Sequence, residues 1–104
     1  QISVNMEDIF YFEYGQNRRV KLVATTGTWY LSSSMKSLEK QMQAYSFLMP
    51  HKSFLVNPRQ ILSFGAEIQM KNHEMIPIAK NRRKQVHEQI SAYLHNSLNI
   101  NWRD

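Results

Sequence analysis

The chain has 104 residues, the size of a single domain, and its 42% content of hydrophobic residues excludes an intrinsically disordered protein. It contains no cysteine, which excludes disulfides and thiolate metal sites, and it lacks the run of roughly 18 apolar residues that a transmembrane helix needs. Thirteen lysines and arginines against eight acidic residues give a net charge of +5, which favours a polyanionic partner, nucleic acid first and an anionic membrane second.

Strand patterns dominate the first 32 residues. Residues 2–4 (ISV) predict a short strand, and residues 9–14 (IFYFEY) predict a longer strand that is apolar on both faces, because they are dense in β-branched and aromatic side chains. After the GQN break at 15–17, polar and apolar residues alternate over 18–26, and the chain returns as TWYLS at 28–32. These last two segments predict a hairpin.

The hydrophobic period then changes to that of a helix. Apolar residues recur every three or four positions at Met35, Leu38, Met42 and Tyr45, and Ser34 is a suitable N-cap. The pattern predicts a short amphipathic helix in the middle of the chain.

Short strands are predicted again in the second half, around residues 47–49, 53–57, 60–65 and 67–70. Residues 70–75 (MKNHEM) predict a hairpin turn, because Asn72 and His73 at its tip tolerate positive φ. Residues 75–78 complete this hairpin, and Pro77 favours an edge strand because proline cannot donate a ladder hydrogen bond.

A C-terminal helix is predicted from Asn81 onward. Its apolar residues fall on one helical face, at Val86, Ile90, Tyr93, Leu94 and Leu98. The fold class predicted by the whole pattern is mainly β, with short antiparallel sheets, one short mid-chain helix and a C-terminal helix.

Cations gather in three segments where strands begin or end: Arg18, Arg19 and Lys21; Lys52; and Lys80, Arg82, Arg83 and Lys84. The last group opens the C-terminal helix, where cations oppose the helix dipole, so that an external anion is favoured there. A rigid β scaffold that presents basic loops is suited to gripping DNA, but a solvated basic face is equally compatible with this distribution.

The MPHKSFLVN stretch places the polar triplet His51, Lys52 and Ser53 between apolar segments. Such a triplet is typical of a rigid polar loop tip and also of an ordinary turn. His51 and Ser53 do not predict nucleophilic catalysis, because no acid lies nearby and no nucleophile-elbow glycines surround the serine. We therefore do not expect an enzyme.

Other residues of interest are interpreted as structural. His87 and His95 lie eight positions apart, too far to share a metal on one helix. The aromatic residues at 10–14 and 29–30 are expected in core strands, which argues against an RNA-binding module with exposed aromatic rings. The methionines at core-like positions are Met35, Met42, Met49, Met70 and Met75.

Five segments occur in a characteristic order: EDIFYFEY, the basic run after the GQN break, MKSLEKQM, PHKSFLVNPRQI and MIPIAKNRRKQV. Together they resemble the LytTR DNA-binding domain, the effector half of LytR/AlgR-type bacterial response regulators, and the resemblance extends from about Met6 to Tyr93. Members of that family usually carry His-Arg/Asn-Ser-Phe-aliphatic-Val-Asn where this chain has HKSFLVN. The resemblance implies a mostly β fold whose sheets pack together and whose loops, not a recognition helix, enter DNA.

Site residues follow from the resemblance by position. Asn17, Arg18 and Arg19 are expected at a first major groove. His51, Lys52 and Ser53 form the tip at the intervening backbone or minor groove, with Lys52 as the contact and His51 as a buttress. Lys80 is expected at a second major groove, with Asn81, Arg82, Arg83 and Lys84 contacting phosphates. This chain has Lys at 52 where the family has Arg or a polar amide, and Lys at 80 where it often has Arg. Lysine acts as a point charge and matches the two acceptors of guanine less well than the bidentate fork of arginine does.

The sequence and the resemblance together predict the sequence-specific double-stranded DNA-binding domain of a bacterial transcriptional regulator. We expect a single cytoplasmic domain over 1–104, without cofactor or membrane contact. We expect it to be a fragment of a longer protein because the chain begins at Gln1 and not Met, and the resemblance implies that this protein is a two-component response regulator. The resemblance also implies a dimer on repeated sites and an N-terminal receiver domain. The competing interpretations are a non-specific nucleic-acid-binding module and a basic protein-interaction domain.

Overall fold

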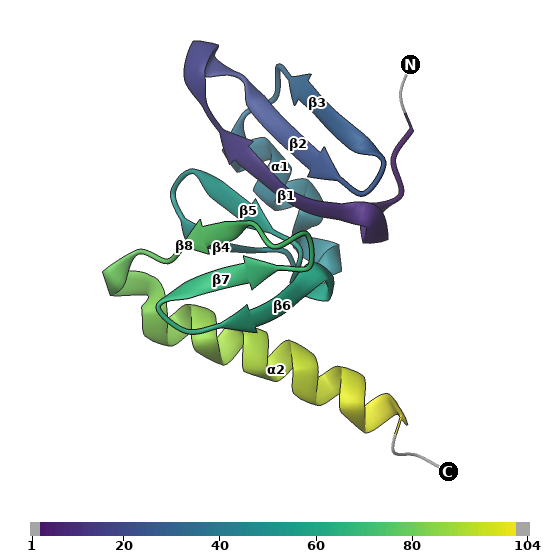
Figure 1. Ribbon diagram of the computed structural model, residues 1–104, viewed down its shortest axis with the longest axis vertical. Coiled ribbons are helices and arrows are strands. Elements are labelled where there is room, and N and C mark those ends of the chain that lie inside the picture. The colour runs from purple at the N-terminus through teal and green to yellow at the C-terminus, as the bar shows by residue number, and fades with distance from the viewer. Residues whose placement is uncertain (1–2, 102–104) are drawn as a thin grey trace.

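Two antiparallel sheets and two α-helices make up the fold in a computed structural model that describes residues 3–101, without the side chains of Gln16 and of 97–101 (Figure 1). The larger sheet contains, in spatial order, β3 (Gly27–Leu31), β2 (Val20–Ala24), β1 (Ile9–Tyr14), β5 (Phe54–Val56) and β4 (Leu48–His51). The smaller sheet contains β6 (Ile61–Phe64), β7 (Glu67–Met70) and β8 (Met75–Pro77). The helices are α1 (Met35–Met42) and α2 (Arg83–Asn101). This arrangement confirms the predicted fold class.

A bulge in β1 lets this one strand serve two hydrophobic cores. Ile9 pairs with Ala24 and Tyr11 with Val23, so Phe10 is an extra residue on the β1 side of the ladder. Phe10 and Tyr11 consequently both belong to the first core, whereas the flanking Ile9 and Phe12 belong to the second. All four side chains are buried, which confirms the prediction of a strand that is apolar on both faces.

The first core lies between the two sheets and under α2. Its most deeply buried members include Val56 of β5, Ile68 and Met70 of β7, and Val86 and Ile90 of α2. Burial, together with the nearby carboxylates of Glu74 and Glu13, raises the pKa of Tyr11 in this core to about 12, so its ring packs as the neutral phenol.

The second core lies between the larger sheet and α1. Ser34 caps α1 as predicted, because its Oγ accepts a hydrogen bond from the backbone N–H of Ser37 (3.1 Å). Leu38 and Met42 are buried against the sheet. The prediction was wrong for Tyr45, which follows in the 3₁₀ turn η3 (Gln43–Tyr45) and is 51% exposed because the α-helical period has ended before it.

The predicted stripe of the C-terminal helix is buried only over its first half. Val86 and Ile90 are buried, Leu94 is 45% exposed, and the side chain of Leu98 lies outside the described residues. Figure 1 shows the reason, since α2 runs past the sheets and leaves its second half without a layer to cover it.

Several other predictions are corrected by the structure. Ser3 and Val4 form no strand, and Ile2 lies outside the described residues. Three side chains expected in the core are exposed: Tyr14 (42%), Tyr30 (62%) and Met75 (50%). Tyr30 and Met75 lie on the edge strands β3 and β8, where one face of the strand has no covering layer. The edge position of Pro77 and the positive φ of His73 (72°) are confirmed.

Asn57 connects the start of β1 to the end of β5. Its Nδ2 donates to the carbonyls of Ile9 (2.8 Å) and Met6 (3.3 Å), and its Oδ1 accepts from the backbone N–H of Arg59 (3.0 Å). The side chain therefore caps the 3₁₀ turn η4 (Pro58–Gln60), and it also fixes a strand that is 48 positions away in sequence. Asn57 is 3% exposed, so water cannot replace these partners.

Asn57→Ala should lower the free energy of unfolding by about 2–3 kcal/mol, because a capping bond is lost and the buried carbonyl of Ile9 loses the amide donor of Asn57. Urea denaturation of the purified domain measures this change. Asn5→Ala is the matched control, since Asn5 precedes η1 (Met6–Asp8), is exposed and makes no side-chain capping bond. It should change stability by less than about 0.5 kcal/mol. Equal losses in the two variants would contradict the role given to Asn57.

Candidate nucleic-acid interface

Two backbone hydrogen bonds bring three loops together at one edge of the molecule. The N–H of Tyr14, at the end of β1, donates to the carbonyl of Ser53 (2.8 Å), and the N–H of Ala79 donates to the carbonyl of Pro50 (2.9 Å). The first loop (residues 15–19), the middle loop (50–53) and the third loop (79–84) therefore lie in this order along the edge that is on the left in Figure 1. We call these 15 residues the basic edge.

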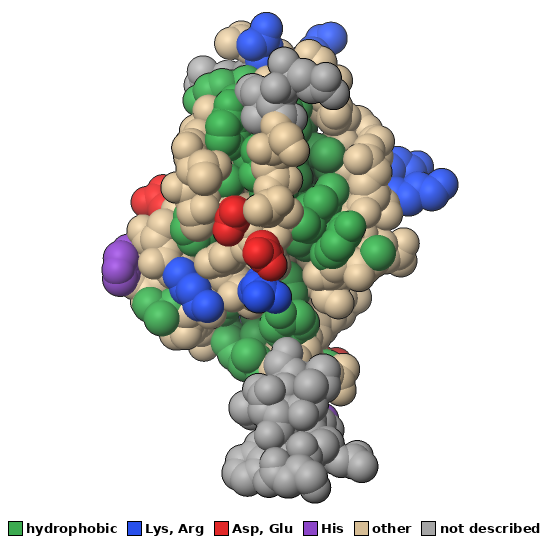
Figure 2. All heavy atoms as spheres, turned by 90° about the vertical axis from the view of Figure 1, so that its right-hand side faces the viewer, with side chains coloured by type: hydrophobic (Ala, Val, Ile, Leu, Met, Phe, Trp, Pro, Cys, Tyr) green, Lys and Arg blue, Asp and Glu red, His purple; other side chains and the backbone are tan. Residues whose placement is uncertain are grey.

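Charge is concentrated at the basic edge. It contains none of the eight acidic residues of the chain and seven of its 13 lysines and arginines: Arg18, Arg19, Lys52, Lys80, Arg82, Arg83 and Lys84. All of these except Arg82 are exposed. Figure 2 shows the side of the molecule turned away from this edge, where hydrophobic side chains gather and acidic side chains lie beside cations. The molecule is therefore electrostatically polarised.

The first loop has an unusual backbone. Asn17 (φ 62°) and Arg18 (φ 57°) are both left-handed, in the 3₁₀ turn η2 (Gln16–Arg18), and the N–H of Gly15 donates to the carbonyl of Arg19 (3.0 Å). A left-handed arginine costs roughly 1–2 kcal/mol, since its Cβ crowds the following carbonyl. The side chains of Asn17, Arg18 and Arg19 are all exposed. The unfavourable left-handed backbone conformation thus occurs where an arginine side chain is exposed to solvent.

The middle loop is held by its histidine. Nδ1 of His51 accepts a hydrogen bond from the backbone N–H of Ser53 (3.1 Å), and its ring lies edge-on to Phe54 with centroids 5.8 Å apart. This confirms the predicted buttress. His51 and Ser53 are half-buried, while Lys52 between them is exposed at the tip. The MPHKSFLVN stretch therefore forms a braced tip, with β4 and β5 paired on either side of it.

The third loop combines exposed cations with one anchor. Nη1 of Arg82 donates to the backbone carbonyl of Met49 (3.0 Å), and the residue is half-buried. This guanidinium ties the 3₁₀ turn η5 (Lys80–Arg82) to β4. Lys80, Asn81, Arg83 and Lys84 remain exposed around it. Sequence reasoning had grouped Arg82 with the phosphate contacts, and nothing in the sequence distinguishes it from Arg83.

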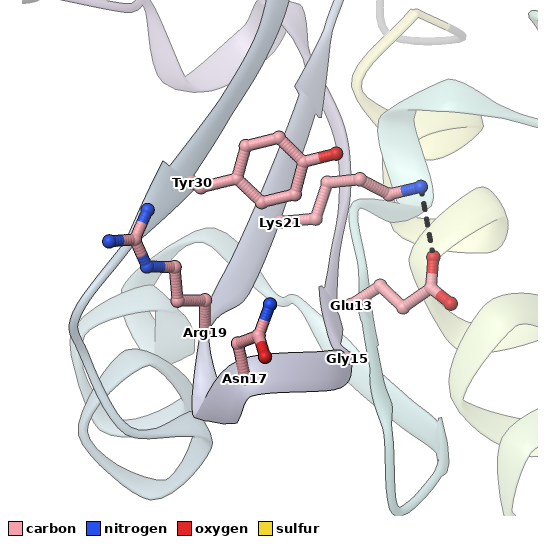
Figure 3. A pocket seen from close by; sticks show the side chains of 6 residues that line it. All are labelled: Glu13, Gly15, Asn17, Arg19, Lys21 and Tyr30. Carbon is pink, nitrogen blue, oxygen red and sulfur yellow. Dashed lines mark ion pairs between the residues drawn. The ribbon is translucent and has the colours of Figure 1, made fainter.

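Lys21 was also grouped with the cations of the first loop, but the fold gives it a partner. It lies directly opposite Glu13 on β1, and its Nζ is 3.4 Å from Oε1 of that residue. Figure 3 shows this pair in an open groove next to the first loop, together with Tyr30. The exposed Tyr30 was missed because β3 reads as a core strand from its composition.

Other classes of site have little support in the part of the chain that the structure describes. No three His, Asp or Glu side chains there are close enough to hold a metal ion. No helix among residues 3–101 is both long and apolar enough to cross a membrane. The basic edge is the main concentration of exposed, chemically uniform side chains.

Comparison with known proteins agrees with this geometry. The family model of the LytTr DNA-binding domain matches residues 1–91. Among solved structures, the chain is similar to the LytTr DNA-binding domain of a putative methyl-accepting/DNA response regulator from Bacillus cereus, with a TM-score of 0.75, 21% identity and coverage of 86% of each chain. At that identity the likeness shows the fold alone. A search of curated proteins found no match. The match over residues 1–91 confirms the predicted family, and the chain belongs to the LytTr DNA-binding domains.

Proposed function

We propose that this domain binds double-stranded DNA in a sequence-specific manner and that the basic edge is its DNA contact. The observation that carries the proposal is the pair of backbone hydrogen bonds, Tyr14 to Ser53 and Ala79 to Pro50, that aligns three cationic loops from distant parts of the sequence. Alignment by the backbone matters because phosphates must be met at fixed spacings. A merely solvated basic surface does not need such alignment.

The order of the three loops suits a duplex. The first, middle and third loops follow one another along one edge, which runs down the left side of Figure 1. Two successive major grooves on one side of B-DNA lie about 34 Å apart, with a minor groove between them. The first and third loops would then enter the two major grooves, and the middle loop would face the intervening minor groove or backbone.

Roles within the edge follow from side-chain chemistry and exposure. Arg18 is the candidate for base readout in the first groove, since a guanidinium can bind both acceptors of guanine. Lys80 takes the equivalent place in the third loop as a point charge. The side chains proposed to contact the backbone are those of Asn17, Arg19, Lys52, Ser53, Asn81, Arg83 and Lys84. Arg82 and His51 act by positioning the loops, because each makes a hydrogen bond to the backbone of β4 or of the middle loop and is half-buried.

The wider context is also a proposal. Membership of the family supports a role in a bacterial transcriptional regulator of the response-regulator type, with a receiver domain in the same protein and two copies of this domain on repeated DNA sites. No enzymatic function is proposed for the basic edge, since it contains no acidic residue that could act as a general acid or base.

Selection from a random duplex pool tests the proposal. We expect enrichment of a motif, and binding of the selected duplex in preference to a scrambled one at moderate salt, measured by fluorescence anisotropy. Both duplexes should show a steep loss of affinity with salt, because phosphate contacts release counterions. If nothing is enriched and the two duplexes bind equally, the basic edge is a sequence-indifferent polyanion surface.

Base and phosphate contacts in the third loop can be separated by two substitutions. Lys80→Ala should weaken binding of the selected duplex by about 1–3 kcal/mol and affect the scrambled duplex less. Lys84→Ala should weaken both duplexes alike and lower the salt slope by about one. Lys71→Ala is the control, because Lys71 is exposed in the β7–β8 turn at the opposite end of β8 from the third loop. Identical behaviour of Lys80→Ala and Lys84→Ala on both duplexes would contradict base readout.

Substitution of Arg18 should affect stability and DNA binding in opposite directions. Arg18→Gly relieves the left-handed strain, so its free energy of unfolding should equal or exceed that of the original chain by up to about 1 kcal/mol. Affinity for the selected duplex should nevertheless fall. Ser46→Gly is the matched control, since Ser46 is exposed, has a φ of 65° and lies outside the basic edge. It should change stability similarly without altering affinity. Undiminished binding by Arg18→Gly would remove Arg18 from the interface.

A further inference from the structure

The groove beside the first loop is an uncovered part of the larger sheet. Its lining residues are Glu13, Gly15, Asn17, Arg19, Lys21 and Tyr30, and its volume is about 790 Å³. The strand register places Tyr30 opposite Lys21, and Lys21 opposite Glu13, so these three side chains project from the same face (Figure 3). The smaller sheet packs on this face over β1, β4 and β5, and the first core contains no residue of β3.

The burial and hydrogen bonding of Tyr30 do not explain why a tyrosine stands at this position. It is 62% exposed, and its hydroxyl makes no hydrogen bond to another residue whose side chain the structure describes. Its neighbours Trp29 and Leu31 point the other way, into the second core. A tyrosine on the outer face of an edge strand exposes the apolar surface of its ring to water. Threonine, which this strand carries at position 28, would favour the strand conformation equally well.

We propose that this groove is a second DNA contact, in which the Tyr30 hydroxyl and the Lys21 ammonium group hold a backbone phosphate on the flank of the site beyond the first loop. The inference rests on the proposed function. A phenol is a neutral donor well suited to a phosphate oxygen, and lysine binds phosphate as a point charge. The ion pair with Glu13 holds the Lys21 side chain in place, and an ammonium group has three N–H donors, so donors remain for the phosphate.

The order of the strands determines which flank is involved. The larger sheet runs β3-β2-β1-β5-β4, and the third loop lies beyond β4, so β3 is at the end of the series farthest from the third loop. Two strand spacings separate β3 from β1, which is roughly 10 Å. One base pair rises about 3.4 Å, so the added contact falls about three base pairs outside the groove that the first loop enters.

The inference is tested by measuring how tightly variants bind two kinds of DNA. These are the selected duplex at full length and duplexes shortened by about three base pairs at one end or the other. Tyr30→Phe should weaken binding of the full duplex about tenfold without changing the salt slope, because a hydrogen bond to a charged group is lost and no charge is removed. Lys21→Met should weaken binding and lower the salt slope by about 0.9. Shortening one end only should weaken the original chain and leave the two variants unchanged.

Three control variants accompany these measurements. Thr28→Val removes an exposed hydroxyl from the same face of β3, two residues farther from the loops, and should bind like the original chain. Lys71→Met removes an exposed lysine at the opposite end of β8 and should also bind normally. Glu13→Gln keeps the lysine and removes the carboxylate, so it should bind DNA more tightly.

The outcomes distinguish this inference from the proposed function. If Lys80→Ala weakens binding and Tyr30→Phe does not, the domain binds DNA but the groove takes no part. If Tyr30→Phe binds normally and Tyr30→Ala binds poorly, the ring contacts a base or sugar by stacking, and the phosphate contact is overturned. If neither Lys80→Ala nor Tyr30→Phe affects binding, the proposed function itself fails. Equal sensitivity of the original chain to shortening at either end would also contradict the flank assignment.

Discussion

The bulge at Phe10 is the constraint on which the rest of the structure depends. A regular strand alternates its side chains strictly between two faces, so six residues offer three to each side. The extra residue instead turns Phe10 and Tyr11 together towards the smaller sheet and α2, and leaves Ile9 and Phe12 for α1. A chain of about a hundred residues can thereby build two cores around one strand. Because β1 is fixed from both faces, the loop that follows it and the loop beside it are also fixed.

Rigidity of the basic edge comes from the backbone and from few side chains. Two carbonyl groups of the middle loop accept backbone hydrogen bonds, one from Tyr14 just before the first loop and one from Ala79 at the start of the third loop. The side chains of His51 and Arg82 add one hydrogen bond each. The cationic side chains are thus exposed on loops whose backbones are held by hydrogen bonds. That division suits an interface in which attraction is electrostatic and specificity depends on position. The left-handed backbone at Asn17 and Arg18 is a local cost of the same arrangement.

Incomplete coverage of the larger sheet shapes the surface next to that edge. The first core takes buried residues from β1, β4 and β5, has Val23 of β2 packed partly against it and includes no residue of β3, so the part of the face that carries Lys21 and Tyr30 stays open to solvent. There the cross-strand pair of Lys21 and Glu13 replaces apolar packing, at a modest gain because both side chains are about one-third exposed. Tyr30 stands in the same row. The basic edge therefore continues into a groove of mixed chemistry.

The sequence by itself determined the elements, the fold class, the family and the charged loops, since each depends on local periodicity or on motifs read along the chain. Val20, Leu22 and Ala24 alternate into a core, and Ser34 caps a helix, whatever lies around them. The resemblance to the family predicted that the middle loop forms a tip braced by His51. Tertiary structure alone decided which neighbours cover a residue. It exposed Tyr30, Tyr45 and Met75, paired Lys21 with Glu13, and turned Arg82 from a free cation into an anchor. The physical reason is that burial and pairing are set by contacts between distant segments, such as Asn57 with Ile9, and a pattern within one segment carries no record of them.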